Sequence, residues 1–220
     1  MYVFEDKPKS IDAEAYRSLR TNIQYLSIEK EIKSIVVTSA CPEEGKSTVL
    51  GNLALSFAQN GKSVIIVDCD LRKPSIHEKF NISNLCGISD VLIGRETLDT
   101  AIQNYKINLD ILTSGKIPQN PAEMINSASM SNLLEELKSK YDILIIDSPP
   151  LEIVTDGQIL STKVDGTILV LKAGQSKISA VKEAKNILNK VGANIIGLVI
   201  NQVSESKKKY PYYYEVDKKK

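Results

Sequence analysis

The sequence predicts an α/β fold, with a doubly wound, mostly parallel sheet and helices on both faces. Short runs rich in Val, Ile and Leu alternate along the chain with longer helical patterns, and this alternation is typical of the class. The strand candidates are apolar at nearly every position, as expected for parallel strands covered on both faces. The 220 residues suit one such domain. We therefore expect a single domain over residues 1–206 and a flexible tail over residues 207–220.

The same alternation places the elements in order. We expect strands over residues 34–40, 63–70, 108–115, 142–150, 165–174 and 194–203. We expect helices over residues 46–60, 96–105, 122–141 and 176–192, with the third of them in two pieces. Gly61 and Gly192 mark the ends of the first and last of these helices, because glycine commonly ends a helix. Residues 11–30 stand outside the alternation as a separate helix candidate.

Composition excludes several classes of function. The chain has 28 Lys and Arg against 27 Asp and Glu, a formal net charge of +1, so its overall charge does not indicate nucleic acid as a partner. Cys41, Cys69 and Cys86 form no CxxC pair, which argues against a zinc site or disulfides and fits a reducing cytosol. No apolar run approaches the ~20 residues of a membrane helix. We expect a cytoplasmic protein, and any membrane role would come through a partner.

A phosphate-binding loop is predicted between the first strand and the helix after it. The segment ACPEEGKST, residues 40–48, matches G-x-x-x-x-G-K-[ST] except that Ala40 replaces the first glycine. Backbone N–H groups and the helix N-terminus bind phosphate in such a loop. Lys46 would reach the β- and γ-phosphates, Ser47 would bind Mg²⁺, and Thr48 would contact the α-phosphate. The predicted nucleotide-binding residues here are Pro42, Glu43, Glu44, Gly45, Lys46, Ser47 and Thr48.

Two further strands end in carboxylates. Asp68 and Asp70 follow one strand in VIIVDCDLRKP, and Asp147 ends another in ILIIDSPP. Because ligands bind outside the carboxyl ends of strands in open α/β sheets, we expect all three at the phosphate loop. We predict that the metal is held by Ser47, Asp68 and Asp147. The predicted catalytic residues are Lys46, Asp68, Asp70 and Asp147. Either Asp68 or Asp70 would serve as general base; the alternative for each single aspartate is a helix cap.

These motifs resemble those of a known family. SIVVTSACPEEGKST, VIIVDCDLRKP and ILIIDSPP are similar to the Walker A, Walker A′ and Walker B motifs of the bacterial tyrosine kinases linked to capsule and exopolysaccharide synthesis. The similarity extends to EAYRSLRTNIQY, GISDVLIG, LDILTSGKIPQNPAEMINS, GLVINQV and the C-terminal tyrosines, and so covers nearly the whole chain. It implies a P-loop NTPase-type fold and a non-specific protein-tyrosine kinase that uses ATP and Mg²⁺.

The chain departs from related patterns at two positions. Glu43 stands where the kinase loop usually has glycine, and a Glu at positive φ would be strained, so we expect an effect on nucleotide affinity. The septum-positioning and plasmid-partitioning ATPases carry an early loop lysine, which would fall at Cys41. Its absence favours the kinases.

The resemblance also implies the substrate and the partners. The kinase would phosphorylate its own tail between subunits, and the predicted phosphorylation sites are Tyr210, Tyr212, Tyr213 and Tyr214. It would thereby regulate capsular and extracellular polysaccharide synthesis and export. Further implied partners are a membrane-bound activator that recruits the chain to the inner face of the cell membrane, other protein-tyrosine substrates, and a cognate tyrosine phosphatase.

Two more features take their meaning from the resemblance. Glu14, Arg17 and Arg20 match an E-x-x-R-x-x-R subunit-contact pattern, which would make residues 11–30 the oligomerisation helix of a homo-oligomeric ring. Asn201 would contact the nucleotide base. From the residues alone, the charge stripe is a solvated helix face, and an aromatic tail packs on a partner. Two other functions stay open: a partitioning-type P-loop ATPase that switches partners without kinase activity, and a non-catalytic regulatory scaffold.

Overall fold

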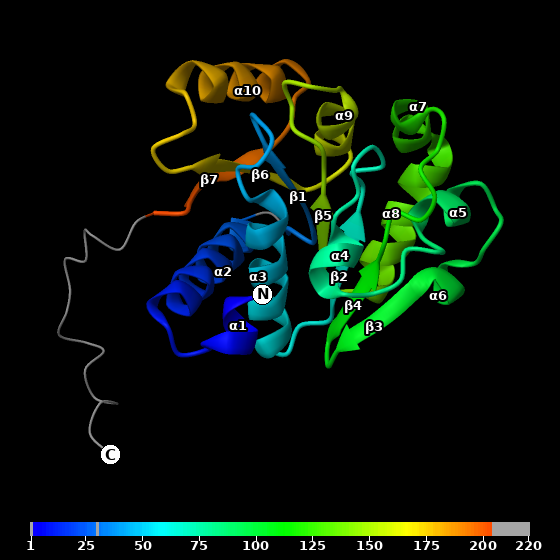
Figure 1. Ribbon diagram of the computed structural model, residues 1–220, viewed down its shortest axis with the longest axis horizontal. Coiled ribbons are helices and arrows are strands. Elements are labelled where there is room, and N and C mark those ends of the chain that lie inside the picture. Colours follow the sequence, from blue (N-terminus) through cyan, green and yellow to red (C-terminus); the bar gives the residue numbers. More distant parts are fainter. Residues whose placement is uncertain (1, 30, 204–220) are drawn as a thin grey trace.

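The computed structural model describes residues 2–29 and 31–203. Within this part of the chain, a seven-stranded sheet has the order β3-β4-β2-β5-β1-β6-β7 (Figure 1). The strands are β1 (Ser34–Ser39), β2 (Val64–Asp68), β3 (Ile102–Lys106), β4 (Leu109–Leu112), β5 (Ile143–Asp147), β6 (Gly166–Lys172) and β7 (Ile195–Asn201). The strand pairs are parallel except β3 with β4 at one edge. The predicted doubly wound, mostly parallel class is confirmed.

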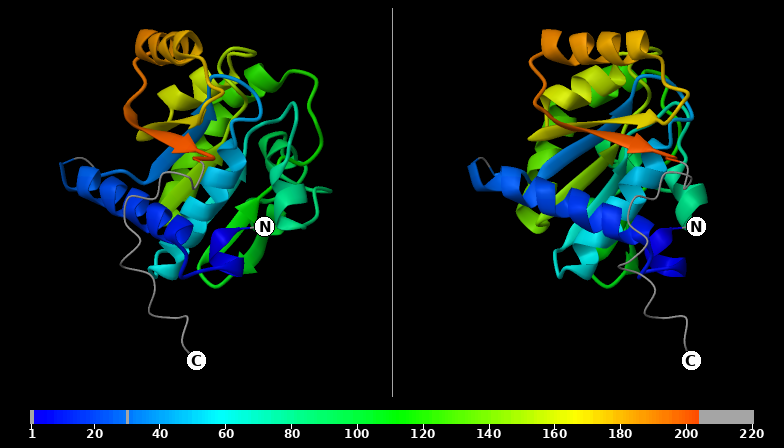
Figure 2. Two further views of the ribbon diagram at one scale, coloured as in Figure 1. Left: turned by 60° about the vertical axis from the view of Figure 1, so that its left-hand side comes forward. Right: turned by 90° about the vertical axis from the view of Figure 1, so that its left-hand side faces the viewer.

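Helices cover both faces of the sheet (Figure 2). They are α1 (Val3–Asp6), α2 (Ile11–Glu29), α3 (Lys46–Gln59), α4 (Ile76–Phe80), α5 (Ile88–Leu92), α6 (Leu98–Ala101), α7 (Pro121–Asn126), α8 (Ala128–Lys140), α9 (Asp156–Thr162) and α10 (Ile178–Lys190). Among the described residues, no helix has both the length and the apolar character that a membrane span requires.

Two apolar layers explain why the strands are apolar at successive positions. Ile35 of β1 belongs to the cluster formed with α1 to α4, which includes Phe57 of α3. The next residue, Val36, belongs to the opposite cluster with Leu137 of α8. Successive side chains of a strand point to opposite faces, so both must be apolar when both faces are covered. A third cluster places Leu188 of α10 over β6.

The helix predicted over residues 96–105 is wrong in its second half. Helix α6 ends at Ala101, and residues 102–106 form β3, which pairs antiparallel with β4. Asn108, in the turn between these strands, has a φ of 64°, which asparagine tolerates better than most residues. Tyr105 meets Phe80 of α4 edge-on, with ring centroids 4.9 Å apart. Edge pairing and packing therefore override the local helical pattern.

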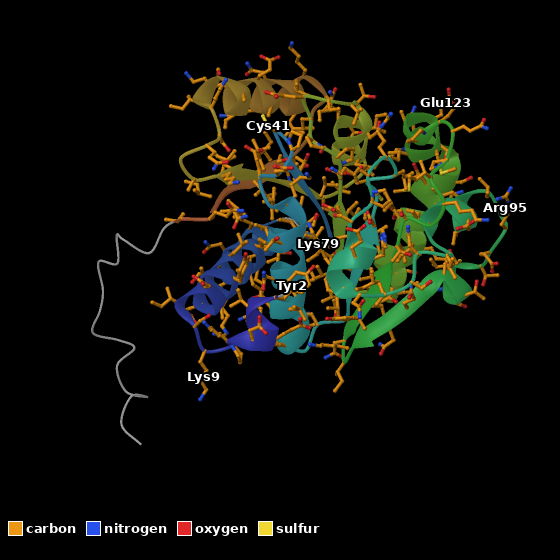
Figure 3. The ribbon with its side chains drawn as sticks, in the orientation of Figure 1. Tyr2, Lys9, Cys41, Lys79, Arg95 and Glu123 are labelled. Carbon is orange, nitrogen blue, oxygen red and sulfur yellow. The ribbon has the colours of Figure 1, made fainter. Side chains whose placement is uncertain are left out.

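The N-terminal segment packs against α3. The guanidinium of Arg20 donates to the carbonyl of Ser56 at 2.8 Å. Tyr2 lies beside α3 (Figure 3), and a Cβ on Gly51 would come within 2.2 Å of its ring. Glycine at position 51 therefore allows the segment before α2 to lie directly on the helix that begins at the phosphate loop.

Strand order places the predicted acids side by side. β2 and β5 are parallel neighbours, and Asp68 lies opposite Asp147 in their register. β1 is the other neighbour of β5, so the loop from β1 into α3 opens at the same edge of the sheet. The carboxyl ends of three adjacent strands therefore form one corner.

Candidate active site

The phosphate loop has a left-handed backbone at two positions. Gly45 has a φ of 87° immediately before α3, and Glu43 has a φ of 62°. Lys46, Ser47 and Thr48 form the first turn of α3. The first N–H groups of a helix have no partner within it; here the N–H group of Thr48 donates to the carbonyl of Gly45 at 3.1 Å. This arrangement suits phosphate binding at a helix N-terminus. The backbone strain expected at Glu43 is present.

Ser47, Asp68 and Asp147 meet at the carboxyl ends of β2 and β5. The hydroxyl of Ser47 donates to Oδ2 of Asp147 at 2.9 Å. Oδ2 of Asp68 accepts the N–H group of Ile76 at 3.1 Å, and its Oδ1 accepts that of Asp70 at 3.2 Å. Ser47, Asp68 and Asp147 are all buried. The structure thus brings together the three residues for which metal binding is predicted.

Two buried carboxylates face each other at this corner. Burial, followed by the charge of Asp147, raises the pKa of Asp68 to about 8. Burial also raises the pKa of Asp147, although Lys46 and the hydrogen bond from Ser47 oppose the shift. Like charges and low dielectric both disfavour the double anion. The corner therefore favours a bound cation.

A magnesium ion fits these residues. Oδ1 of Asp147 is buried and has no hydrogen-bond partner among the described residues, which is unusual for a buried acceptor. Mg²⁺ prefers oxygen ligands and keeps several waters, so one or two carboxylates and a hydroxyl suffice to hold it. Asp68, Asp147 and Ser47 supply that set.

Asp70 lies just beyond β2 and is only partly buried. Its Oδ1 accepts the N–H group of Lys73 at 3.0 Å. Burial raises its pKa, and the hydrogen bond from Lys73 and the charge of Lys46 oppose this. Asp70 is thus close enough to Lys46 to feel its charge and more accessible than Asp68.

An ion pair beside the site was not predicted. Arg72, in the loop after β2, binds Asp156 of α9 with two hydrogen bonds of 2.8 and 3.1 Å. Asp156 is fully buried, so the pair fixes the loop that carries Asp70 to α9. The two residues are 84 positions apart, and nothing in the local sequence pattern of either indicates the other.

Asn201 holds the phosphate loop from the end of β7. Its Nδ2 donates to the carbonyl oxygen of Glu44 at 3.1 Å. A Cβ on Gly45 would lie 2.0 Å from that nitrogen, so glycine is needed here for space as well as for φ. Thr48 and Asn201 also line a cavity of about 630 Å³ between α2, α3 and β7.

The other side of the loop carries an uncharged thiol. Cys41 lies below α10 (Figure 3) and lines a cavity of about 590 Å³ with Pro42 and Glu43. Its Sγ donates to a carboxylate oxygen of Glu152 at 3.1 Å. Burial, then Glu152, raises the pKa of the thiol to about 11. A neutral group therefore occupies the position where the partitioning ATPases have a lysine.

The predicted subunit-contact residues lie on α2 and contact their own chain. Glu14 and Arg17 form an ion pair at 3.0 Å, and Arg17 also donates to the carbonyl of Pro8 at 2.6 Å. Arg20 bonds to Ser56, as described above. Their role in a ring stays a prediction. The predicted phosphorylation sites Tyr210, Tyr212, Tyr213 and Tyr214 lie outside the described residues.

Comparison with known proteins places the chain. Residues 32–198 match a family described as an AAA domain. The septum site-determining protein MinD from Pyrococcus horikoshii, solved with Mg-ADP, has a TM-score of 0.66 at 25% identity, over 80% of this chain and 72% of that one. The chain thus has the predicted P-loop NTPase-type fold of nucleotide-binding proteins.

Two relatives are more similar. Tyrosine-protein kinase YwqD of Bacillus subtilis (strain 168) is 42% identical over 209 residues, which are 94% of this chain and 88% of that protein. The kinase domain of Escherichia coli tyrosine kinase ETK has a TM-score of 0.90 at 32% identity, over 97% of this chain and 85% of that one. The chain therefore belongs to the bacterial tyrosine kinases.

Proposed function

We propose that this kinase uses ATP and Mg²⁺ to phosphorylate tyrosines of its own C-terminal tail, between subunits of a homo-oligomeric ring. One observation carries the proposal: Asp68 and Asp147 are buried opposite each other beside Ser47, at the mouth of the phosphate loop. Burial of two carboxylates is unfavourable unless a cation joins them. The chain belongs to the tyrosine kinases and has four tyrosines within residues 210–214, so its own sequence contains candidate substrates.

The nucleotide would lie along the first turn of α3. Lys46 and the N–H groups of that turn would hold the β- and γ-phosphates, and Thr48 the α-phosphate. The base would occupy the cavity that Thr48 and Asn201 line. Because Nδ2 of Asn201 already donates to Glu44, its Oδ1 is left as an acceptor. An acceptor complements the amino group of adenine.

The residues of the corner would divide the work of phosphoryl transfer. Mg²⁺, held by Ser47, Asp68 and Asp147, would supply positive charge at the transferred phosphate. The tyrosine oxygen bonds to the γ-phosphorus, the bond to the ADP oxygen breaks, and the phenolic proton passes to a carboxylate. Asp68 would bind Mg²⁺ in this scheme, which favours its ionised form, whereas Asp70 is not a proposed metal ligand and is the more exposed of the two. The proton acceptor would be Asp68 or Asp70.

The proposed biology follows the family. The kinase would regulate capsular and extracellular polysaccharide synthesis and export. A membrane-bound activator would recruit it to the inner face of the cell membrane. Other proteins would also be phosphorylated on tyrosine, and a cognate phosphatase would reverse the modification. No nucleic acid enters this scheme.

A partitioning-type ATPase shares the fold and is the rival function. The likeness to MinD supports the shared architecture. That role uses a second lysine in the loop, however, and here the position is held by the neutral thiol of Cys41. A non-catalytic scaffold would not need the orphaned acceptor on Asp147. Both observations favour the kinase.

Phosphotyrosine mapping tests the proposal. The full chain is incubated with ATP and Mg²⁺, alone and with the activator's cytoplasmic segment, and phosphorylated peptides are identified by mass spectrometry. We expect label on Tyr210, Tyr212, Tyr213 or Tyr214, loss of label with EDTA, and at least a 100-fold loss in Lys46→Met, on the order expected for electrostatic catalytic groups. Lys62→Met is the matched control, because Lys62 is exposed and pairs with Asp142. Phosphate release without tyrosine label would identify an ATPase instead.

A further inference from the structure

Glu44 places a buried carboxylate inside the phosphate loop. Only 3% of the residue is exposed. A buried carboxylate is unfavourable unless it is well paired, and this one stands in a loop proposed to receive an anionic triphosphate. Its neighbours Glu43 and Gly45 both have positive φ, so the backbone turns sharply on each side of it. Such a residue needs a structural or functional reason.

Its hydrogen bonds join three strand ends. Oε2 of Glu44 accepts the N–H group of Cys41 at 3.0 Å, which closes a ring within the loop. Oε1 accepts the hydroxyl of Ser176, and the Ser176 oxygen in turn accepts the N–H group of Lys172, the last residue of β6, at 2.7 Å. The main-chain carbonyl of Glu44 accepts from Asn201 of β7. One residue thereby ties the loop after β1 to the ends of β6 and β7.

The turn that supplies Ser176 is itself fixed. The N–H group of Ala173 donates to the carbonyl of Asn201 at 2.9 Å, and the N–H group of Ser176 donates to the carbonyl of Lys172 at 3.0 Å. The hydroxyl of Ser176 therefore has a set position relative to the sheet. A loop bonded to it cannot relax its two left-handed residues independently.

We propose that Glu44 is a positioning residue that holds the phosphate loop in its binding conformation before the nucleotide arrives. Its side chain acts through Cys41 and Ser176, while its backbone N–H group keeps its predicted place among the phosphate-binding groups of the loop. The loop pattern leaves position 44 unspecified, and the inference rests on the proposed nucleotide site. A loop that is already ordered loses less entropy on binding. When only a fraction of molecules has the loop in its binding conformation, the apparent affinity for the nucleotide falls in proportion to that fraction. Saturating nucleotide brings all molecules into the binding conformation.

This mechanism predicts a separation of affinity from turnover. Binding is measured on the full chain by titration with a fluorescent ATP analogue and Mg²⁺, and turnover by tail labelling at saturating ATP. We expect Glu44→Ala to raise Kd and KM at least tenfold while kcat stays within twofold. Ser176→Ala should raise Kd about threefold, and Ser176→Thr, which keeps the hydroxyl, should restore it. The double variant Glu44→Ala/Ser176→Ala should be no weaker than Glu44→Ala, because the two residues act as a unit.

The control is Glu183→Ala, since Glu183 is exposed and lines the cavity beside the loop from α10. Its Kd should stay within twofold of that of the unmodified chain. A Kd within twofold for Glu44→Ala, or a loss of kcat without a change in KM, would overturn the proposal. Should Glu44→Ala melt before it can be titrated, equal Kd values for Ser176→Ala and Ser176→Thr would overturn it. If the unmodified chain itself fails to bind, the proposed nucleotide site is wrong rather than the role of Glu44.

Discussion

At the scale of single residues, Glu43 has a strained backbone conformation within the phosphate loop. It is exposed and adopts a φ of 62°. The left-handed conformation costs a residue with a Cβ about 1–2 kcal/mol, whereas glycine adopts it freely but loses about 0.5–1 kcal/mol of chain entropy on folding. The usual kinase loop has glycine here, so the strain is a property of this chain.

Glu43→Gly should therefore stabilise the nucleotide-free protein. We expect a gain of about 0.5–1 kcal/mol, the difference between the two effects, or roughly 1–4 °C in Tm for a chain of this size. Thermal unfolding followed by circular dichroism measures it. Glu43→Ala retains the Cβ and should show no comparable gain. Equal melting temperatures for the two variants would show that the φ value is not the source of strain.

The sequence predicted some residues of the site and missed others for a clear reason. The corner of Ser47, Asp68 and Asp147 follows from local motifs, because each residue sits at the end of its own strand or the start of its own helix. The bond from Ser176 to Glu44 joins positions 132 apart, and its partner lies in a turn without a motif. Local patterns place strand ends, but they do not show which side chains of distant loops will meet.

At the scale of elements, Asp165 links the starts of two neighbouring strands. From the residue before β6, its Oδ2 accepts the N–H groups of Lys33 and Ser34 at 3.0 and 2.8 Å, and the hydroxyl of Ser34 at 2.8 Å. Burial alone would raise its pKa, but the hydrogen bonds from Ser34 and Lys33 and the charge of Lys138 outweigh burial and lower it. The ionised form therefore stabilises the pairing of β1 with β6.

Asp165→Asn should destabilise the protein in a pH-dependent way. Hydrogen bonds to a charged group contribute about 1.5–3 kcal/mol, and the site is partly exposed, so we expect a loss of about 1–2 kcal/mol at pH 7. The pKa of Asp165 is lower in the folded state than in the unfolded state, where an aspartate has a pKa near 3.9. The ionised carboxylate therefore stabilises the folded protein fully above that unfolded-state pKa, and the stabilisation is lost as the pH falls through the folded-state pKa. The difference in the free energy of unfolding between variant and parent should thus become smaller below about pH 4.

Urea unfolding at pH 7 and at pH 3 measures the free energy of unfolding of the variant and of the parent at each pH. Asp99→Asn is the control, because Asp99 is exposed and pairs only with Lys140 in the described structure. It should change stability by less than about 0.5 kcal/mol at either pH. A difference for Asp165→Asn that stays constant between the two pH values would show that its charge does not stabilise the strand pairing.

Elements were predictable where burial dominates and unpredictable at the edge. β1, β2 and β5 occupy the centre of the sheet and are buried throughout, so their apolar runs identify them. Gln103 and Asn104 of the edge strand β3 are partly buried or exposed, so their pattern carries little strand signal. Only pairing with β4 and the contact of Tyr105 with Phe80 select the strand, and neither is visible locally.

At the scale of the whole molecule, the tail proposed as the substrate has a net positive charge, opposite in sign to the carboxylates of the candidate site. Residues 207–220 contain six lysines against Glu215 and Asp217, and the corner with Asp68 and Asp147 is acidic. Each phosphate adds a charge of about −1.5 to −2, so phosphorylation of the four tyrosines would reverse the sign of the tail. Attraction before transfer and repulsion after it would favour release of the modified tail.

The proposed exchange of tails between subunits makes a prediction that separates it from labelling within one chain. One copy carries Lys46→Met and keeps its tyrosines, and the other keeps Lys46 but has Phe at positions 210, 212, 213 and 214. Neither copy can label itself, because one lacks the phosphate-loop lysine and the other lacks the acceptors. We expect the mixture, but neither copy alone, to incorporate phosphate on the Lys46→Met chain.

The rate of labelling should fall on dilution as the ring dissociates, because assembly depends on concentration. If the mixture stays unlabelled while the unmodified chain labels itself at a rate independent of dilution, the tail enters the site of its own chain and the ring is not required for catalysis.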